Sequence, residues 1–180
     1  MMTVLPLVIA PDPRLKTPSK PVDSITDEVR AFMDDMLETM YNMQGIGLAA
    51  VQVGVHQRIL VMDINRASER YPDAESGEES HPIFMVNPEI IARSKEDNIY
   101  EEGCLSFPGQ YAEVTRPERV TIQYLDYHGN AQTLECDGLL ATCVQHEIDH
   151  LDGITFVDHL SRMKREMVLR RLKKQQKQND

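Results

Sequence analysis

The sequence predicts an α+β fold in which antiparallel β-sheets surround a central buried helix, with an amphipathic helix near the N-terminus and another helix at the C-terminus. Apolar residues recur at helical spacing in separate stretches of the chain, and short apolar or alternating runs bounded by turn residues lie between them. A chain of 180 residues with 41% apolar and 27% charged residues has the length and composition of one globular domain over residues 1–180.

The first part of the chain predicts one helix and one strand. Residues 25–43 are expected to form an amphipathic helix, because apolar side chains recur every three or four residues and Thr26 can cap the first turn. The glycine-rich segment 45–54 contains no phosphate-binding pattern, and its small residues suit the close approach of another chain. Residues 58–64 predict a buried strand. Residues 66–82 are polar, acidic and rich in turn formers, which predicts a surface insertion loop.

The second part of the chain predicts strands followed by a core helix. Strands are expected at 83–92 and 98–104, and a hairpin should join 119–126 to 131–136. Residues 138–150 predict a helix that is apolar on most sides and is therefore buried. The sheets are consequently expected to pack around this helix.

The C-terminal helix, expected over residues 158–178, combines an apolar face with a basic end. Its docking face is predicted to consist of Leu160, Met163, Met167, Val168, Leu169 and Leu172. Residues 161–180 carry eight Lys or Arg side chains against two acidic ones, whereas the whole chain has a net charge of −10. This distribution argues against a DNA-binding surface and allows a local contact between the helix and an anionic partner.

Two further features predict a cytoplasmic protein. No apolar run approaches the roughly 18–20 residues that span a bilayer, and the first residues lack the features of a signal peptide, so no membrane association is expected. The three cysteines are widely spaced and odd in number, which argues against a disulfide framework and favours a reduced compartment.

One short run in the core helix carries a specific chemical pattern. His146 and His150 are four residues apart, so on a helix they share one face and can bind the same metal ion. Glu147 follows the first histidine, where its carboxylate can reach a water molecule on that metal. The run is therefore an HExxH motif, typical of hydrolytic metal sites, and it makes the central helix a metal-binding helix.

The third protein ligand has to come from elsewhere. The longer HExxHxxGxxH pattern fails, because its last position holds Phe156. Glu166 is the only glutamate after Glu147 and would give a thermolysin-like site, although it lies in the basic C-terminal helix. Cys104 is the stronger candidate, since it follows a glycine at a predicted strand end, where a thiolate can be presented without crowding.

Three separated segments together resemble the signature motifs of peptide deformylase, of the bacterial iron-dependent type. They are residues 45–52 (GIGLAAVQ), 102–106 (EGCLS) and 145–150 (QHEIDH), in the family's order and at plausible separations. The resemblance extends over nearly the whole chain. The sequence departs from the family at Val51, where many members have Pro or Thr, and at Gly109 and Tyr111, where some bacterial members have an acidic residue and an arginine.

The resemblance implies removal of the formyl group from N-formylmethionine of nascent peptides, with release of formate. The implied metal ligands are Cys104, His146 and His150, which leave a fourth position open for water, as a catalytic site requires. Fe²⁺ is the ion expected in the cell, with Zn²⁺, Ni²⁺ or Co²⁺ as substitutes. The three implied catalytic residues are Glu147 as general base and acid, and Gln52 and the backbone N–H of Leu105 as oxyanion donors.

The resemblance also implies a substrate groove and a supporting ion pair. The segment Gly45–Gly47 would pair with the substrate backbone as an added strand. The other implied substrate-binding residues, most of them in the methionine pocket, are Ile46, Tyr100, Gly103, Leu139, Thr142 and Cys143. Glu102 and Arg116 would form an ion pair that holds the Cys104 segment.

Two alternatives to this function remain open from the sequence. One is an HExxH zinc endopeptidase that uses Glu166 as its third ligand. The other is a non-catalytic ribosome-associated module that acts through the basic C-terminal helix. The second is partly compatible with deformylation, because ribosome contact would place the enzyme, expected to be a monomer, where its substrate emerges.

Overall fold

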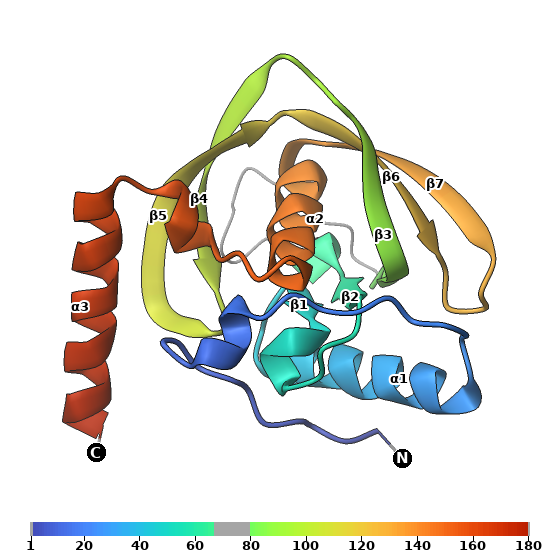
Figure 1. The fold of residues 1–180 in the computed structure, drawn as a ribbon, viewed down its shortest axis with the longest axis horizontal. Helices are drawn as coiled ribbons and strands as arrows, with labels where there is room; N and C mark the ends of the chain where they lie inside the picture. The colour runs from blue at the N-terminus through green and yellow to red at the C-terminus, as the bar shows by residue number, and fades with distance from the viewer. Residues whose placement is uncertain (1, 67–79, 180) are drawn as a thin grey trace.

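The computed structural model describes residues 2–66 and 80–179, so most of the insertion predicted at 66–82 lies outside the described residues. Two antiparallel sheets form the framework (Figure 1). The larger has the strand order β1-β2-β3-β6-β7, with bounds β1 Gly47–Ala49, β2 Ile59–Met62, β3 Ile83–Arg93, β6 Arg119–Leu125 and β7 Ala131–Asp137. The smaller pairs β4 Asp97–Cys104 with β5 Phe107–Pro117. The predicted α+β class is confirmed.

Helix α2 (Gly138–Leu151) lies at the centre of the molecule, with the sheets around it (Figure 1). Eleven of its 14 residues are buried, as the apolar sequence predicts. Its apolar side chains pack with strands β1, β2, β6 and β7 in one core cluster that includes Ala141, Val144 and Ile148. The polar residues among the eleven include His146, Glu147 and His150, and they carry the candidate site.

Helix α1 (Asp27–Asn42) begins and packs as the sequence predicts. The Thr26 side chain accepts a hydrogen bond from the backbone N–H of Val29 at 3.2 Å and so caps the first turn. Met33, Met36 and Met40 recur on one face and are fully buried against β2 and its neighbours. None of the described helices is long and apolar enough to cross a membrane.

Helix α3 (Arg162–Asn179) begins later than predicted, and two of the six residues of the predicted docking face, Met163 and Met167, do not dock. Residues 156–159 form a separate 3-10 turn, η4 (Phe156–His159), so Leu160 precedes the helix. Met163 and Met167 are 72% and 41% exposed, because they lie on the side of α3 away from the body. Val168 and Leu172 are buried, as expected, in a cluster with Phe107 and Phe156.

Several elements were not predicted, among them two strands and two 3-10 turns. Strand β1 is only three residues long, and β5 contains prolines and a glycine that break the strand pattern. Two further 3-10 turns, η1 (Pro13–Lys16) and η2 (Ala50–Val53), lie on either side of α1 in the sequence. These elements matter for function, because β1, β5 and η2 all contribute to the pocket described below.

Gly153 is predicted to be required by the turn that follows α2. Its φ is +76°, and a Cβ at this position would lie 2.5 Å from the backbone oxygen of Lys16. Gly129 also has a positive φ, of +87°, but a Cβ there would meet nothing closer than 3.8 Å. We expect Gly129→Ala to lower the free energy of unfolding by about 1–2 kcal/mol, and Gly153→Ala by about 1–3 kcal/mol more, since the backbone must also shift.

Urea unfolding of the two variants beside the unchanged chain measures this difference. Equal losses of stability in Gly153→Ala and Gly129→Ala would show that the contact with Lys16 has no energetic weight.

Candidate metal centre and substrate pocket

Cys104, His146 and His150 are brought together by the fold. Their potential ligand atoms all lie within 4.8 Å of one another, and they form the only such group of three among residues 2–66 and 80–179. The Cys104 Sγ lies 3.3 Å from the His150 Nε2. Donors around a tetrahedral ion with bonds of about 2.0–2.3 Å require separations of this size. One thiolate and two imidazoles therefore fit a divalent transition-metal ion.

The two histidines converge because they are one turn apart on α2. Their rings meet edge to face with centroids 5.0 Å apart. Phe156, which occupies the position of the third histidine in the longer HExxH pattern, stacks on the His146 ring at 6.0 Å. Burial lowers the pKa of His150, so its imidazole remains neutral, the form that binds a metal.

Glu102 orients His146 from the opposite side of the ring. Its Oε1 lies 2.8 Å from the His146 Nδ1, so that nitrogen donates and the Nε2 is left to face the centre. Arg116 donates to both oxygens of Glu102, at 2.7 and 3.0 Å, which is the ion pair that the resemblance implied. Burial raises the pKa of Glu102, but the hydrogen bonds from His146 and Arg116 outweigh it and lower that pKa to about 2.

Glu147 has the properties of a proton acceptor. Its carboxylate is buried, its Oε1 lies 3.7 Å from the His146 Nε2, and its Oε2 has no hydrogen-bond partner among the described residues. Burial raises the pKa of Glu147 to about 7, although the nearby His146 opposes this shift. A carboxylate whose pKa lies near neutrality can both take up and release a proton at physiological pH.

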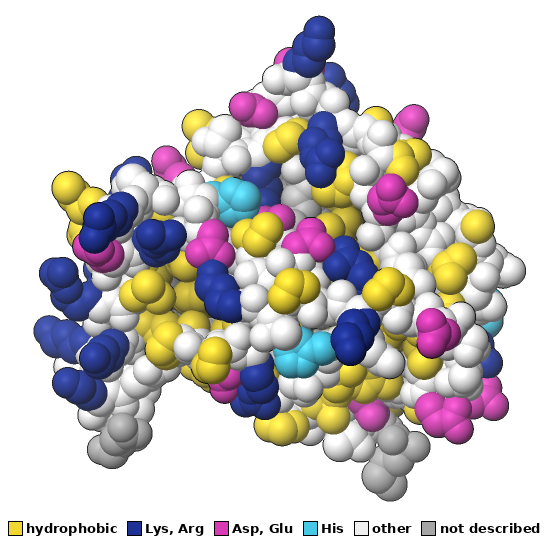
Figure 2. Space-filling view, in the orientation of Figure 1, with side chains coloured by type: hydrophobic (Ala, Val, Ile, Leu, Met, Phe, Trp, Pro, Cys, Tyr) yellow, Lys and Arg dark blue, Asp and Glu magenta, His cyan; other side chains and the backbone are white. Residues whose placement is uncertain are grey.

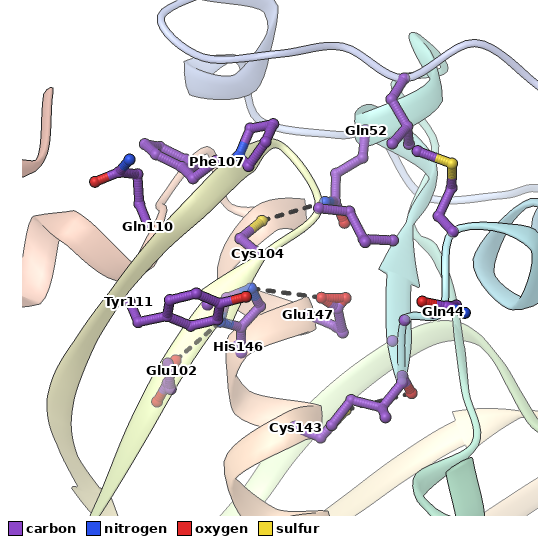
Figure 3. A pocket seen from close by; sticks show the side chains of 18 of the residues that line it. Gln44, Gln52, Glu102, Cys104, Phe107, Gln110, Tyr111, Cys143, His146 and Glu147 are labelled. Carbon is purple, nitrogen blue, oxygen red and sulfur yellow. Dashed lines mark hydrogen bonds and ion pairs between the residues drawn. The ribbon is translucent and has the colours of Figure 1, made fainter. Parts of the chain in front are cut away.

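Gln52 presents its amide nitrogen to the same space. Its Oε1 accepts a hydrogen bond from the backbone N–H of Ala49 at 2.9 Å, which fixes the orientation of the amide. Its Nε2 then donates to the Ser106 hydroxyl at 3.1 Å and points to the Cys104 Sγ at 3.3 Å. Figure 3 shows Gln52, Cys104, His146 and Glu147 directed toward one another. Leu105 follows Cys104 in the turn between β4 and β5.

These groups open into a cavity of about 400 Å³. Beside the catalytic candidates, its walls include most of the predicted substrate-binding residues: Gly45, Ile46, Gly47, Gly103, Leu139, Thr142 and Cys143. Tyr100, also predicted for the pocket, is not among the residues that line this cavity. It lies four residues before Cys104 on β4, about 13 Å away along a strand, and its hydroxyl is near Gly138 at the start of α2.

Several lining residues were not predicted. They are Leu7, Ile9, Met43, Gln44, Phe107, Pro108, Gly109, Gln110 and Tyr111. The alternation of Leu5, Leu7 and Ile9 was a usable signal for an extended segment with one apolar face. In the sequence, Gly109 and Tyr111 stand out only as departures from the family pattern. Figure 3 shows Tyr111 and Gln110 on β5, beside the metal-site residues.

The glycines at 45 and 47 are required by close packing. A Cβ on Gly47 would lie 3.0 Å from the Cys143 Sγ and from the side chain of Glu147. A Cβ on Gly45 would lie 2.8 Å from a methyl group of Leu105. Glycine therefore keeps the edge of β1 open to the cavity.

Glu166, the third ligand of the alternative endopeptidase, is not part of this centre. It lies on α3 with its side chain 56% exposed and pairs with Arg162 at 3.2 Å. The geometry thus favours Cys104 as the third donor.

Comparisons with known proteins agree with the motifs. A family model described as polypeptide deformylase matches residues 4–166. A peptide deformylase of Rhizobium meliloti is 50% identical over 173 residues, covering 96% of this chain and 94% of the relative. One of Rickettsia prowazekii is 55% identical over 173 residues, covering 96% and 97%.

Solved structures give the same result for the fold. A crystal structure of peptide deformylase from Ehrlichia chaffeensis has a TM-score of 0.89 and 44% identity, covering 98% of this chain and 99% of that one. A structure of the Ehrlichia chaffeensis protein in complex with actinonin has a TM-score of 0.87 at 44% identity, covering 97% and 98%.

The ion pair of Arg116 with Glu102 should be essential for stability. Both side chains are at most 5% exposed, so Arg116→Met leaves a carboxylate buried without its counter-charge. We expect this change to lower the free energy of unfolding by about 3–5 kcal/mol. Arg119→Met is the matched control, because Arg119 pairs with Glu96 on the surface, where such pairs contribute less than about 1 kcal/mol. Chemical denaturation that gave the same loss for both variants would contradict this prediction.

Proposed function

The chain belongs to the peptide deformylase family, and on this premise we propose that Cys104, His146 and His150 hold one divalent metal ion at its catalytic centre. The enzyme is a hydrolase that removes the formyl group from nascent peptides. The convergence of these three donors beside a buried, unpartnered carboxylate oxygen of Glu147 is the observation that carries the assignment of roles. When bound, such an ion supplies a Lewis acid that activates water and polarises the formyl group.

The substrate backbone is proposed to bind along β1. This strand is at the edge of the five-stranded sheet, pairs with β2 on one side only, and borders the cavity through Gly45 and Gly47. An extended peptide can add to such an edge through main-chain hydrogen bonds. The methionine side chain then enters the space lined by Ile46, Leu139, Thr142 and Cys143, which is mostly apolar.

Glu147 is proposed to move the proton in both halves of the reaction. It accepts a proton from the attacking water as the new C–O bond forms at the formyl carbon. It then donates that proton to the amide nitrogen as the C–N bond breaks, which yields formate and a free amino terminus. A pKa near neutrality suits both steps.

The negative charge that develops on the formyl oxygen needs hydrogen-bond donors. We assign this role to the Gln52 side-chain amide, whose Nε2 lies 3.3 Å from the Cys104 Sγ, and to the backbone N–H of Leu105, the residue after Cys104. Loss of one donor of this kind typically costs about 2.7–4 kcal/mol in activation free energy. The Ala49 hydrogen bond to Gln52 holds the amide in place before the substrate arrives.

The ion in the cell is proposed to be Fe²⁺, and the enzyme is proposed to act as a cytoplasmic monomer on N-formylmethionyl nascent peptides. A donor set of one thiolate and two imidazoles also accepts Zn²⁺, Ni²⁺ or Co²⁺. Elemental analysis of protein purified without oxygen identifies the ion, and a metal other than iron would contradict the assignment. Light scattering tests the oligomeric state.

Two substitutions separate the proposed roles. Glu147→Gln should keep the metal and lower formate release from formyl-Met-Ala-Ser by about 10²–10⁴-fold, because the proton acceptor is lost. Cys104→Ser should lose both metal and activity, because a ligand is lost. Metal content by elemental analysis and formate production are measured together.

The alternative endopeptidase predicts a different pattern for the same variants. With Glu166 as the third ligand, Cys104→Ser would keep its metal and its activity, and Glu166→Gln would lose them. That result, or no formate release by the metal-loaded unchanged chain, would refute the assignment.

Helix α3 is proposed to contact the ribosome. Dark blue Lys and Arg side chains cover the part of the surface formed by α3 (Figure 2). On this helix Arg170, Arg171, Lys173, Lys174 and Lys177 are exposed, as are Met163 and Met167. A cationic helix that also presents apolar side chains suits a surface of RNA and protein.

Charge reversal tests this contact better than truncation, because Val168 and Leu172 of α3 are buried in the body. Lys173→Glu, Lys174→Glu and Lys177→Glu together should abolish co-sedimentation with ribosomes at low salt and leave activity on a tripeptide unchanged. The control, Lys20→Glu, Arg93→Glu and Lys95→Glu, makes the same change in net charge at exposed positions outside α3. Equal binding of the two triple variants would refute a specific role for α3.

A further inference from the structure

The ion pair of Glu102 and Arg116 is part of a larger set of hydrogen bonds that reaches the surface. Arg116 uses its Nε and Nη2 for Glu102, and its Nη1 donates to the Asp149 Oδ2 at 2.8 Å. The same Asp149 oxygen accepts from the His159 Nε2 at 2.7 Å. The exposed fractions of the side chains rise along this path, from 3% at Glu102 and 5% at Arg116 to 19% at Asp149 and 35% at His159.

These contacts form a closed ring that begins and ends on α2. His146 of α2 binds Glu102 of β4, Glu102 binds Arg116 of β5, and Arg116 binds Asp149, which is again on α2. Asp149 is three residues after His146, so the two side chains leave the helix on neighbouring faces. The ring therefore fixes the position of β4, which ends at Cys104, relative to the helix that carries both histidines.

Asp149 determines how Arg116 can hold Glu102. A guanidinium that binds a single carboxylate can tilt about that contact, whereas two carboxylates on different edges fix its plane. His159 in turn restrains Asp149. Because the carboxylate of Asp149 is an acceptor, the short contact identifies the His159 Nε2 as the donor. The Arg116 Nη1 is also a donor, so its 3.5 Å approach to the His159 Nε2 is not a hydrogen bond.

We propose that Asp149 and His159 are positioning residues of the metal centre, which act through Arg116 and Glu102 to fix the imidazole of His146 and the separation of Cys104 from the two histidines. The inference rests on the proposed metal site. It extends that site to two residues that touch neither the ligand atoms nor the cavity. Partners of this kind commonly change metal affinity by about 10–100-fold.

Zinc affinity of the folded protein provides the main test. In competition with a chromophoric chelator, Asp149→Asn should raise the dissociation constant for Zn²⁺ by about 10–100-fold. His159→Phe should raise it less, since Arg116 keeps its bond to Asp149. His159→Gln should restore much of the loss, because its amide can donate to Asp149. Asp152→Asn, which removes the surface pair with Arg58 at the end of the same helix, should leave the affinity unchanged.

A second measurement reports on His146 itself. In the zinc form, the Nδ1–H proton of His146 should be visible by NMR in ¹⁵N-histidine-labelled protein, since it is held by Glu102. In Asp149→Asn and His159→Phe this proton should shift and exchange faster with water. A merely structural role for either residue would lower the melting temperature and leave both the zinc affinity and this signal unchanged.

The outcomes are separable. If Asp149→Asn and His159→Phe bind zinc as tightly as the unchanged chain and the His146 signal does not move, the inference is wrong and the proposed metal site stands. If the unchanged chain binds no zinc, the proposed site fails and the inference fails with it. Should Asp149→Asn not fold, the two His159 variants, at a position that is 35% exposed, decide the question.

Discussion

Helix α2 lies in the core yet carries ionisable side chains, so the neighbouring elements must supply hydrogen-bond partners for them. Gln145, His146, Glu147 and His150 are all at most 8% exposed, and buried polar groups cost free energy unless they are paired. The surrounding elements supply most of these partners. Strand β4 supplies Glu102 for His146, and the end of β5 supplies a backbone oxygen for the Gln145 amide at 3.0 Å. The two polar atoms of α2 that are left without a partner among the described residues are the His150 Nδ1 and the Glu147 Oε2. The Glu147 Oε2 belongs to the carboxylate that we propose as the proton acceptor and donor.

The three sequence motifs meet at α2, which carries one of them. Strand β1, at the edge of the larger sheet, and strand β4 of the smaller sheet both contact this helix. Strand β1 places Gly47 next to Cys143 and Glu147, and Gly45, just before the strand, lies next to Leu105; larger residues would not fit at either position. The turn after β4 places Cys104 over the histidines, and Ser106 then anchors the Gln52 amide. Each motif therefore supplies part of the support for another. Substitution in one segment should consequently disturb groups that belong to the other two.

Local patterns in the sequence were sufficient for the long elements and for the family. Helix α1 could be predicted from Thr26 and the spacing of its methionines, and α2 from its apolar composition. Strand β5 could not, because Pro108 and Gly109 mimic a loop and its pairing with β4 is a tertiary contact. The exposure of Met163 and Met167 could not be foreseen either, since helical periodicity does not say which side of α3 meets the body. Asp149 lies within the QHEIDH segment, but His159 is ten residues further on and belongs to no motif, so only the folded chain shows that they meet.

The attachment of α3 has a consequence for where the active site faces. Val168 and Leu172 pack this helix against Phe107, and the Gln175 Oε1 accepts a hydrogen bond from the Gln110 Nε2 at 3.2 Å. The helix therefore contacts two residues of the cavity wall. The helix is therefore packed directly against the wall of the pocket. If a partner surface bound α3, the cavity would face one fixed direction relative to that surface. The effective concentration of an emerging chain end at the metal would then depend on whether the cavity faces it.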